Sequence, residues 1–89
     1  MTTYRIIVTG RVQGVGFRYY TCEKARSLSL KGTVKNLSDG SVEILVQGSK
    51  EPISQFLEWC HKGPPTALVS RLDYEATGPI PDEGFEILR

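Results

Sequence analysis

The chain contains few of the residue types that most often bind metals: it has a single histidine, His61, and two cysteines, Cys22 and Cys60. The cysteines lie far apart without Cys-x-x-Cys spacing, and with one histidine they do not form a recognisable zinc site. Carboxylates such as Glu23 and Glu43 do not recur at metal-ligand spacing, and we interpret them as solvated surface residues. The sequence therefore predicts no metal and no other cofactor. Both cysteines are interpreted as buried thiols, with a disulfide as the alternative.

An excess of charge of one sign is also absent, because 11 Lys and Arg residues face 10 Asp and Glu residues for a net charge of +1. No global field therefore attracts the chain to nucleic acid or to a membrane, and any anion has to be bound locally. No apolar run approaches the roughly 18 residues that span a bilayer. The first residues show neither a signal-peptide nor a transit-peptide pattern, which predicts a cytoplasmic protein.

The length of 89 residues leaves no room for two independent cores, so we expect one compact domain over residues 1–89. Hydrophobic residues make up 39% of the chain and charged residues 24%, as in an ordinary globular protein. We expect it to act as a monomer on a small molecule.

The first third of the chain predicts a strand and then a helix. Residues 4–9 include the β-branched run Ile-Ile-Val and are followed by Gly10, which we expect to end the strand. After a glycine-rich stretch, small or apolar residues recur at helical spacing, and we expect the helix to end near Leu30. This stripe consists of Phe17, Thr21, Ala25 and Leu28.

The middle of the chain predicts a hairpin and a second helix. Residues 33–37 and 42–47 resemble strands, and the Asp-Gly pair between them favours a tight turn. Ser49 can cap a helix that tolerates Pro52 in its first turn and ends at the Gly-Pro-Pro of residues 63–65. The buried stripe of this helix is predicted to be Ile53, Phe56, Leu57 and Cys60.

The last third predicts two more strands. Leu68, Leu72, Tyr74 and Ala76 alternate as in a strand, residues 78–84 form a loop, and Phe85 and Ile87 belong to a short edge strand. The element order is therefore βαββαβ plus a terminal strand. That order predicts an α+β, ferredoxin-like sandwich with a mostly antiparallel sheet and two helices on one face. This fold carries many activities, so function has to be argued from the site.

The glycine-rich stretch of residues 10–18 lies between the first strand and the first helix, where successive backbone N–H groups can surround an anion. The unpaired N–H groups and the dipole at the helix start favour phosphate, and the planar guanidinium of Arg18 matches two phosphate oxygens. Neither the Walker pattern nor G-x-G-x-x-G occurs here. Taken alone, Arg18 can equally be an exposed residue, and Asn36 can simply occupy a turn beside the hairpin.

Taken whole, the stretch resembles the signature of the acylphosphatase family, Gly-Arg-Val-Gln-Gly-Val-x-Phe-Arg, and all of its specified positions match at residues 10–15, 17 and 18. A second block, Lys-Gly-x-Val-x-Asn followed by Asp-Gly-x-Val-Glu, matches residues 31–36 and 39–43. The similarity runs from about Tyr4 to Ile87. We see no departure at a motif position.

The resemblance implies hydrolysis of small acyl phosphates to a carboxylate and inorganic phosphate, with Arg18 binding the phosphate and Asn36 positioning the attacking water. It also implies a phosphate-binding backbone formed by Gln13, Gly14, Val15, Gly16, Phe17 and Arg18. A carboxylate leaves without protonation, so no general acid is needed and His61 is expected to be structural. Tyr19 and Tyr20 are assigned no role.

Two rival functions remain to be weighed. An RNA-recognition module shares this strand order, but it needs exposed aromatic residues on its third strand, where residues 42–47 have none. A small-ligand regulatory module also uses this fold, although such modules usually act fused to an enzyme.

Overall fold

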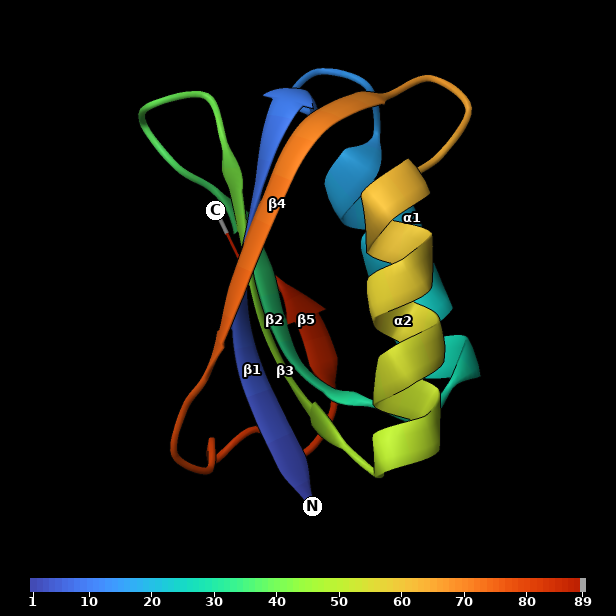
Figure 1. The fold of residues 1–89 in the computed structure, drawn as a ribbon, viewed down its shortest axis with the longest axis vertical. Coiled ribbons are helices and arrows are strands. Elements are labelled where there is room, and N and C mark those ends of the chain that lie inside the picture. The colour runs from blue at the N-terminus through green and yellow to red at the C-terminus, as the bar shows by residue number, and fades with distance from the viewer. Residues whose placement is uncertain (89) are drawn as a thin grey trace.

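A computed structural model describes residues 1–88 as a five-stranded sheet with both helices on one face (Figure 1). The strand order is β4-β1-β3-β2-β5, and all neighbours are antiparallel except β2 and β5, which are parallel. This architecture confirms the α+β, ferredoxin-like prediction. The elements are β1 (Thr2–Arg11), α1 (Phe17–Ser27), β2 (Lys31–Asn36), β3 (Val42–Gly48), α2 (Lys50–Lys62), β4 (Leu68–Ala76) and β5 (Phe85–Ile87). No helix in the described residues is long and apolar enough to cross a membrane.

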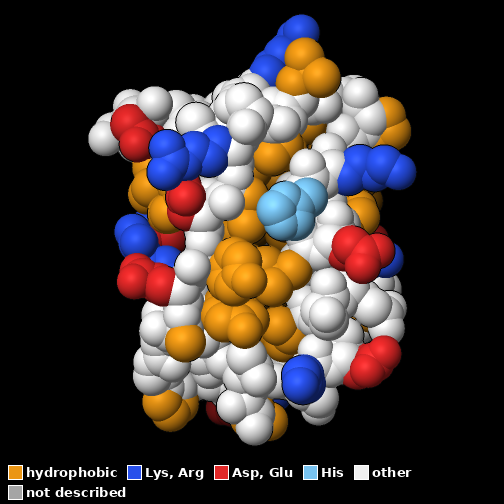
Figure 2. Space-filling model, in the orientation of Figure 1, with side chains coloured by type: hydrophobic (Ala, Val, Ile, Leu, Met, Phe, Trp, Pro, Cys, Tyr) orange, Lys and Arg blue, Asp and Glu red, His pale blue; other side chains and the backbone are white. Residues whose placement is uncertain are grey.

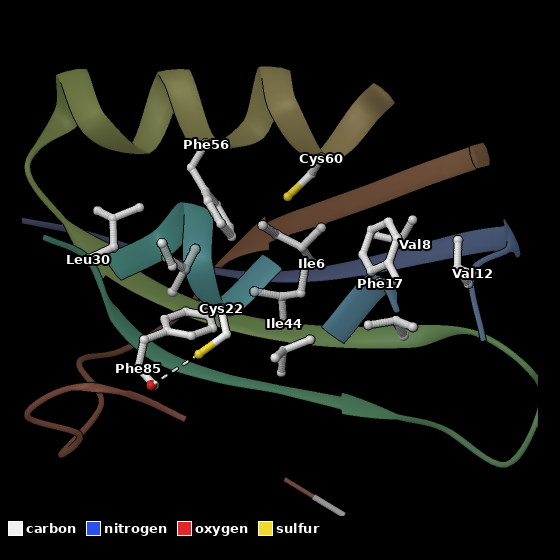
Figure 3. Close-up of a cluster of buried hydrophobic side chains, with 14 of the residues drawn as sticks. Ile6, Val8, Val12, Phe17, Cys22, Leu30, Ile44, Phe56, Cys60 and Phe85 are labelled. Carbon is white, nitrogen blue, oxygen red and sulfur yellow. Dashed lines mark hydrogen bonds between the residues drawn. The ribbon is translucent and has the colours of Figure 1, made fainter. Parts of the chain in front are cut away.

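The core lies between the sheet and the two helices, as Figure 3 shows for the side chains of Phe56 and Cys60 that point from α2 toward β1 and β3. Both predicted helical stripes are buried except at Leu28 and Leu57, which are partly exposed. Burial of apolar area at about 25 cal/mol per Å² is the main force that holds the helices to the sheet. The sheet and helices together fix the ends of β1, β2 and α1, which carry the candidate site.

Helix α1 ends earlier than the sequence suggested, because Ser29 adopts a left-handed conformation with φ 57°. The N–H of Ser29 donates to the carbonyl of Arg26, and the N–H of Leu30 donates to the carbonyl of Ala25. These two bonds form a Schellman motif, which satisfies carbonyl groups that a helix end leaves unpaired. The chain then enters β2 at Lys31.

Gly10 does not end the first strand as predicted, because β1 continues to Arg11 after a bulge. Val8 pairs with Leu72 and Gly10 pairs with Val69, so β4 carries one extra residue, Ser70. A one-residue shift moves the following side chains to the other face of the sheet. The predicted alternation placed Leu68 on the same face of the strand as Leu72. The shift turns Leu68 to the other face, where it is 69% exposed.

Strand β4 is an edge of the sheet that α2 covers only in part, and none of its residues is fully buried. Figure 2 shows an apolar area between β4 and α2, and it also shows positive and negative side chains interspersed around that area. Tyr74 of β4 is 53% exposed but still packs edge-on against Tyr4, with ring centroids 5.0 Å apart. This edge lies at the opposite end of the strand order from β2 and β5.

Glu43 is not the solvated carboxylate that the sequence suggested, because its side chain is only 14% exposed on the sheet face opposite the helices. Its carboxylate accepts a hydrogen bond from Nε of Arg5 at 2.7 Å and lies 3.7 Å from Nζ of Lys35. The alternation of β3 places Glu43 on this face, and pairing with β1 and β2 brings both cations to it. A carboxylate this buried is stable when such partners replace its water.

Both cysteines are buried free thiols, which confirms the interpretation of the sequence over the disulfide alternative. Sγ of Cys22 lies 3.4 Å from the carbonyl oxygen of Phe85, to which it donates (dashed in Figure 3). Burial raises the pKa of the Cys22 thiol, and it raises the pKa of the fully buried Cys60 thiol much further. A thiol with a raised pKa is a poor nucleophile, so these residues act as packing groups.

Candidate active site

The loop from Val12 to Gly16 joins the end of β1 to the start of α1 at one end of the sheet (Figure 1). Gly14 and Gly16 have φ of 75° and 78°, a left-handed conformation that residues with a Cβ atom rarely adopt. The carbonyl of Gly16 accepts the first helical bond, from the N–H of Tyr20. The backbone N–H groups of residues 17–19, which precede Tyr20, receive no partner from the helix. The helix dipole also makes this end of α1 electropositive.

A pocket of about 230 Å³ opens beside this loop, between the first turn of α1 and the adjacent ends of β2 and β5. Such a volume suits a small ligand, since pockets for drug-sized molecules hold about 300–1,000 Å³. The pocket is lined by Val12, Gly14, Gly16, Phe17, Arg18, Tyr19, Asn36 and Ile87. Arg18 is the only charged residue among them, so the pocket favours an anion.

Arg18 occupies the first turn of α1 and is half-buried. Its Nη1 atom lies 3.4 Å from the carbonyl oxygen of Leu88, just after β5, so the guanidinium spans from the helix toward the sheet edge. Arginine offers several N–H donors in one plane, a geometry that matches two oxygens of a phosphoryl group. Its position beside the N-terminal N–H groups of α1 adds a second source of positive potential.

Asn36 is the last residue of β2 and lines the same pocket. Its Oδ1 atom is buried and has no hydrogen-bond partner in the protein. Buried polar atoms are nearly always paired, and an unpaired one costs about 1–3 kcal/mol, so Asn36 has an acceptor that the protein itself does not satisfy. The amide can both donate and accept, which suits it to orient a water molecule.

The structure separates the predicted phosphate-binding residues into two groups. Gly14, Gly16, Phe17 and Arg18 line the pocket together with Asn36. Gln13 and Val15 do not line the pocket, and they instead hold the loop from outside.

Gln13 donates from Nε2 to the carbonyl oxygens of Leu37 and Ser41, at 2.8 and 2.9 Å. On the other side of the loop, the carbonyl of Val15 accepts a hydrogen bond from Oγ1 of Thr66 at 2.7 Å. These bonds tie the loop to the β2–β3 turn and to the segment after α2. Nothing in the sequence pattern indicated Thr66, and the side-chain role of Gln13 is visible only in the tertiary structure.

The β2–β3 turn next to Asn36 is itself ordered by Asp39 and Ser41. The carboxylate of Asp39 accepts hydrogen bonds from the hydroxyl and the N–H of Ser41, and these bonds hold the pKa of Asp39 below its ordinary value. Leu37 N–H donates to the carbonyl of Ser41 at 2.8 Å, which closes the turn. The predicted Asp-Gly hairpin is therefore confirmed, and it gives Asn36 a fixed support.

Other candidate groups lie outside the pocket. His61 is exposed in the last turn of α2 and is not among the lining residues. Within residues 1–88, no three His, Cys, Asp or Glu side chains are grouped as ligands for a metal ion. Tyr19 and Ile87, which the sequence left without a role, do line the pocket.

Fold and site together define the class: a small ferredoxin-like protein with a pocket at the start of its first helix, where Arg18 is the one charged residue of the described lining. Residues 4–87 match the family model of acylphosphatases. The acylphosphatase of Vibrio parahaemolyticus is 49% identical over 84 residues, which cover 94% of this chain and 93% of that protein. The acylphosphatase of Trichormus variabilis is 46% identical over 84 residues, which cover 94% of this chain and 83% of that protein. The solved acylphosphatase of Bacillus subtilis superposes with a TM-score of 0.95 at 40% identity and full coverage of both chains.

The chain belongs to the acylphosphatase family, as its two sequence motifs predicted. Its reaction is the hydrolysis of acyl phosphates, with an acyl phosphate as substrate and phosphate as product. The RNA-binding and regulatory alternatives are not favoured by these relatives.

Proposed function

We propose that Arg18 and the backbone of residues 13–18 bind the phosphoryl group, while Asn36 holds the water molecule that attacks phosphorus. The observation that carries this assignment is that Asn36, whose Oδ1 has no hydrogen-bond partner in the protein, lines the same pocket as Arg18. An acceptor that binds a water proton leaves an oxygen lone pair directed toward the substrate.

In the proposed reaction the water oxygen forms a bond to phosphorus as the bond from phosphorus to the carboxylate oxygen breaks. Charge develops on the phosphoryl oxygens, and Arg18 with the loop N–H groups is placed to stabilise it. The carboxylate is a weak base and leaves without a proton, and the protons of the water pass to phosphate and solvent. Positioning and charge stabilisation are the protein's whole contribution.

Rigidity of the loop is part of this proposal. Donors placed in advance lose little free energy to reorganisation when charge develops. The bonds from Gln13 and Thr66 restrain the loop from two sides, and both leave its N–H groups free of these contacts. The loop is therefore suited to bind phosphate without a large conformational change.

Substitution of Arg18 tests the binding half of the proposal. Arg18→Gln removes the charge and Arg18→Lys removes the planar fork, so both variants are expected to lose at least about a hundredfold in kcat/KM on benzoyl phosphate. Inhibition by inorganic phosphate should weaken in parallel. Circular dichroism checks the fold, and a folded Arg18→Gln variant with near-normal kcat/KM would overturn the assignment.

Substitution of Asn36 tests the other half. Asn36→Ala is expected to lower kcat by at least about a hundredfold while inorganic phosphate still inhibits with an unchanged constant. Because Oδ1 of Asn36 has no hydrogen-bond partner in the protein, the substitution breaks no bond through that atom and the variant should remain folded. If phosphate inhibition disappears from a folded variant, Asn36 binds phosphate rather than water.

We further propose that the protein acts as a cytoplasmic monomer with one domain and has no nucleic-acid or membrane partner. A net charge of +1 with interspersed signs (Figure 2) supports the absence of polyanionic partners, and two free thiols suit a reducing compartment. Light scattering on a size-exclusion column should give a mass near 9.9 kDa. A dimer mass, or retention on heparin at physiological salt, would contradict this proposal.

A further inference from the structure

The lining of the pocket includes apolar side chains that the proposed phosphate site does not use. Building on the function proposed above, we infer that Tyr19 and Ile87 form an acyl subsite that selects acyl phosphates with apolar, especially aromatic, acyl groups. Tyr19 comes from the first turn of α1 and Ile87 from β5, so the subsite is assembled from two elements.

The assignment follows from what each lining residue offers. Gly14 and Gly16 have no side chain, and Arg18 and Asn36 are the polar groups assigned to phosphate and water. The remaining lining residues are Val12, Phe17, Tyr19 and Ile87.

Their exposure separates these four. Val12 and Phe17 are each 1% exposed, so they present almost no surface to a ligand. Tyr19 is 57% exposed and Ile87 is 39% exposed, although both belong to the pocket. The acyl group of a bound substrate therefore has these two side chains as its available apolar contacts within the described lining.

The ring of Tyr19 and the backbone of Ile87 are both positioned before substrate arrives. The ring of Tyr19 packs edge-on against that of Tyr20, with centroids 5.3 Å apart. Ile87 pairs with Val34 of the neighbouring strand, and the N–H of Leu88 donates to the carbonyl of Val34 at 2.8 Å. Contacts from ordered side chains cost little conformational entropy on binding, so they add to substrate affinity.

The chemistry of the subsite sets its preference. A phenol ring and a branched aliphatic chain gain free energy from burying apolar area, and an aromatic acyl ring can also stack on Tyr19. No lining residue other than Arg18 carries charge, so a charged acyl group has no additional ionic partner here. Benzoyl phosphate should therefore be preferred over acetyl phosphate.

Parallel kinetics on benzoyl and acetyl phosphate test the subsite. Tyr19→Ala and Ile87→Ala are each expected to lower kcat/KM for benzoyl phosphate about tenfold and to change that for acetyl phosphate less than about threefold. Tyr19→Phe should retain the preference, because the ring rather than the hydroxyl makes the contact. The matched control is Tyr74→Ala, an exposed tyrosine on the opposite edge of the sheet, which should leave the ratio unchanged.

The outcomes separate this inference from the function on which it rests. If the unaltered protein hydrolyses both substrates but Tyr19→Ala and Ile87→Ala lower both rates equally, or neither rate, the subsite is wrong and the phosphate site stands. If the unaltered protein hydrolyses neither substrate, the proposed function fails first. The inhibition constant of inorganic phosphate should not change in either variant, since neither side chain is assigned to the phosphoryl group.

Discussion

Oγ1 of Thr66 donates a hydrogen bond of 2.7 Å to the carbonyl oxygen of Val15, which links the segment after α2 to the loop between β1 and α1. The bond directs one carbonyl of the loop toward Thr66. A carbonyl oxygen turned into the pocket would repel a phosphoryl group, so this bond helps to keep the loop in its anion-binding conformation. We therefore expect Thr66 to act as a positioning residue for the proposed phosphate site, with an effect on phosphate affinity.

Thr66→Val, which replaces the hydroxyl with a methyl group, is expected to weaken inhibition by inorganic phosphate about fivefold. That change corresponds to about 1 kcal/mol, the usual net value of one hydrogen bond. Thr66→Ser retains the donor and should restore tight inhibition. Because Thr66 is exposed, the midpoint of thermal unfolding should hardly change. An unaltered inhibition constant in Thr66→Val would exclude the positioning role.

The enzyme should discriminate strongly by leaving group. An alkoxide is a far stronger base than a carboxylate and needs a proton donor to leave, and the pocket lining contains no carboxylic acid or histidine. Acyl phosphates should therefore be hydrolysed rapidly and alkyl phosphates hardly at all. The two rates should differ by many powers of ten, each of which corresponds to about 1.4 kcal/mol of activation free energy. Comparable kcat/KM on benzoyl phosphate and an alkyl phosphate would reveal a proton donor outside the proposed set.

Activity on benzoyl phosphate should survive EDTA and the substitution His61→Ala. We assign no step to a metal ion, and His61 lies outside the pocket on the last turn of α2. Because His61→Ala removes no group that we assign to the reaction, kcat should be nearly unchanged in that variant. Loss of activity on chelation, or in the His61→Ala variant, would contradict this prediction.

Both thiols should resist modification in the native protein. Cys60 is fully buried and Cys22 is 3% exposed, and burial raises the pKa of each thiol, so little thiolate forms at neutral pH. Titration with a disulfide reagent should therefore detect almost no thiol before denaturation and two per chain after it. Rapid reaction of either thiol in the native state would show that the surrounding core opens locally.

Ser29→Gly should stabilise the fold. Ser29 is exposed and left-handed at φ 57°, a conformation that costs about 1 kcal/mol for residues with a Cβ atom. Part of this gain is offset by the greater freedom of glycine in the unfolded chain, which leaves a net increase of about 0.5 kcal/mol. Ser29→Ala keeps the strain and is the control. Urea denaturation of both variants measures the difference, and equal midpoints would contradict the prediction.

The sequence determined the local elements well, because helices and strands follow from residue spacing. The stripe at Ile53, Phe56 and Cys60 predicted the buried face of α2, and the Asp-Gly pair predicted the β2–β3 hairpin. The acylphosphatase motifs were sufficient to assign the family. Each of these signals is contained in a short segment, so no knowledge of distant contacts was needed.

Properties that depend on register between distant segments were decided only by the tertiary structure. The bulge at Ser70 turned Leu68 outward, and pairing of β3 with β1 and β2 gave Glu43 its cations. Tyr19 and Ile87 line the same pocket because β5 pairs in parallel with β2, next to the first turn of α1. Side chains from remote segments come together only once the strands have paired in a particular register. A shift of that register by one residue would change every such contact.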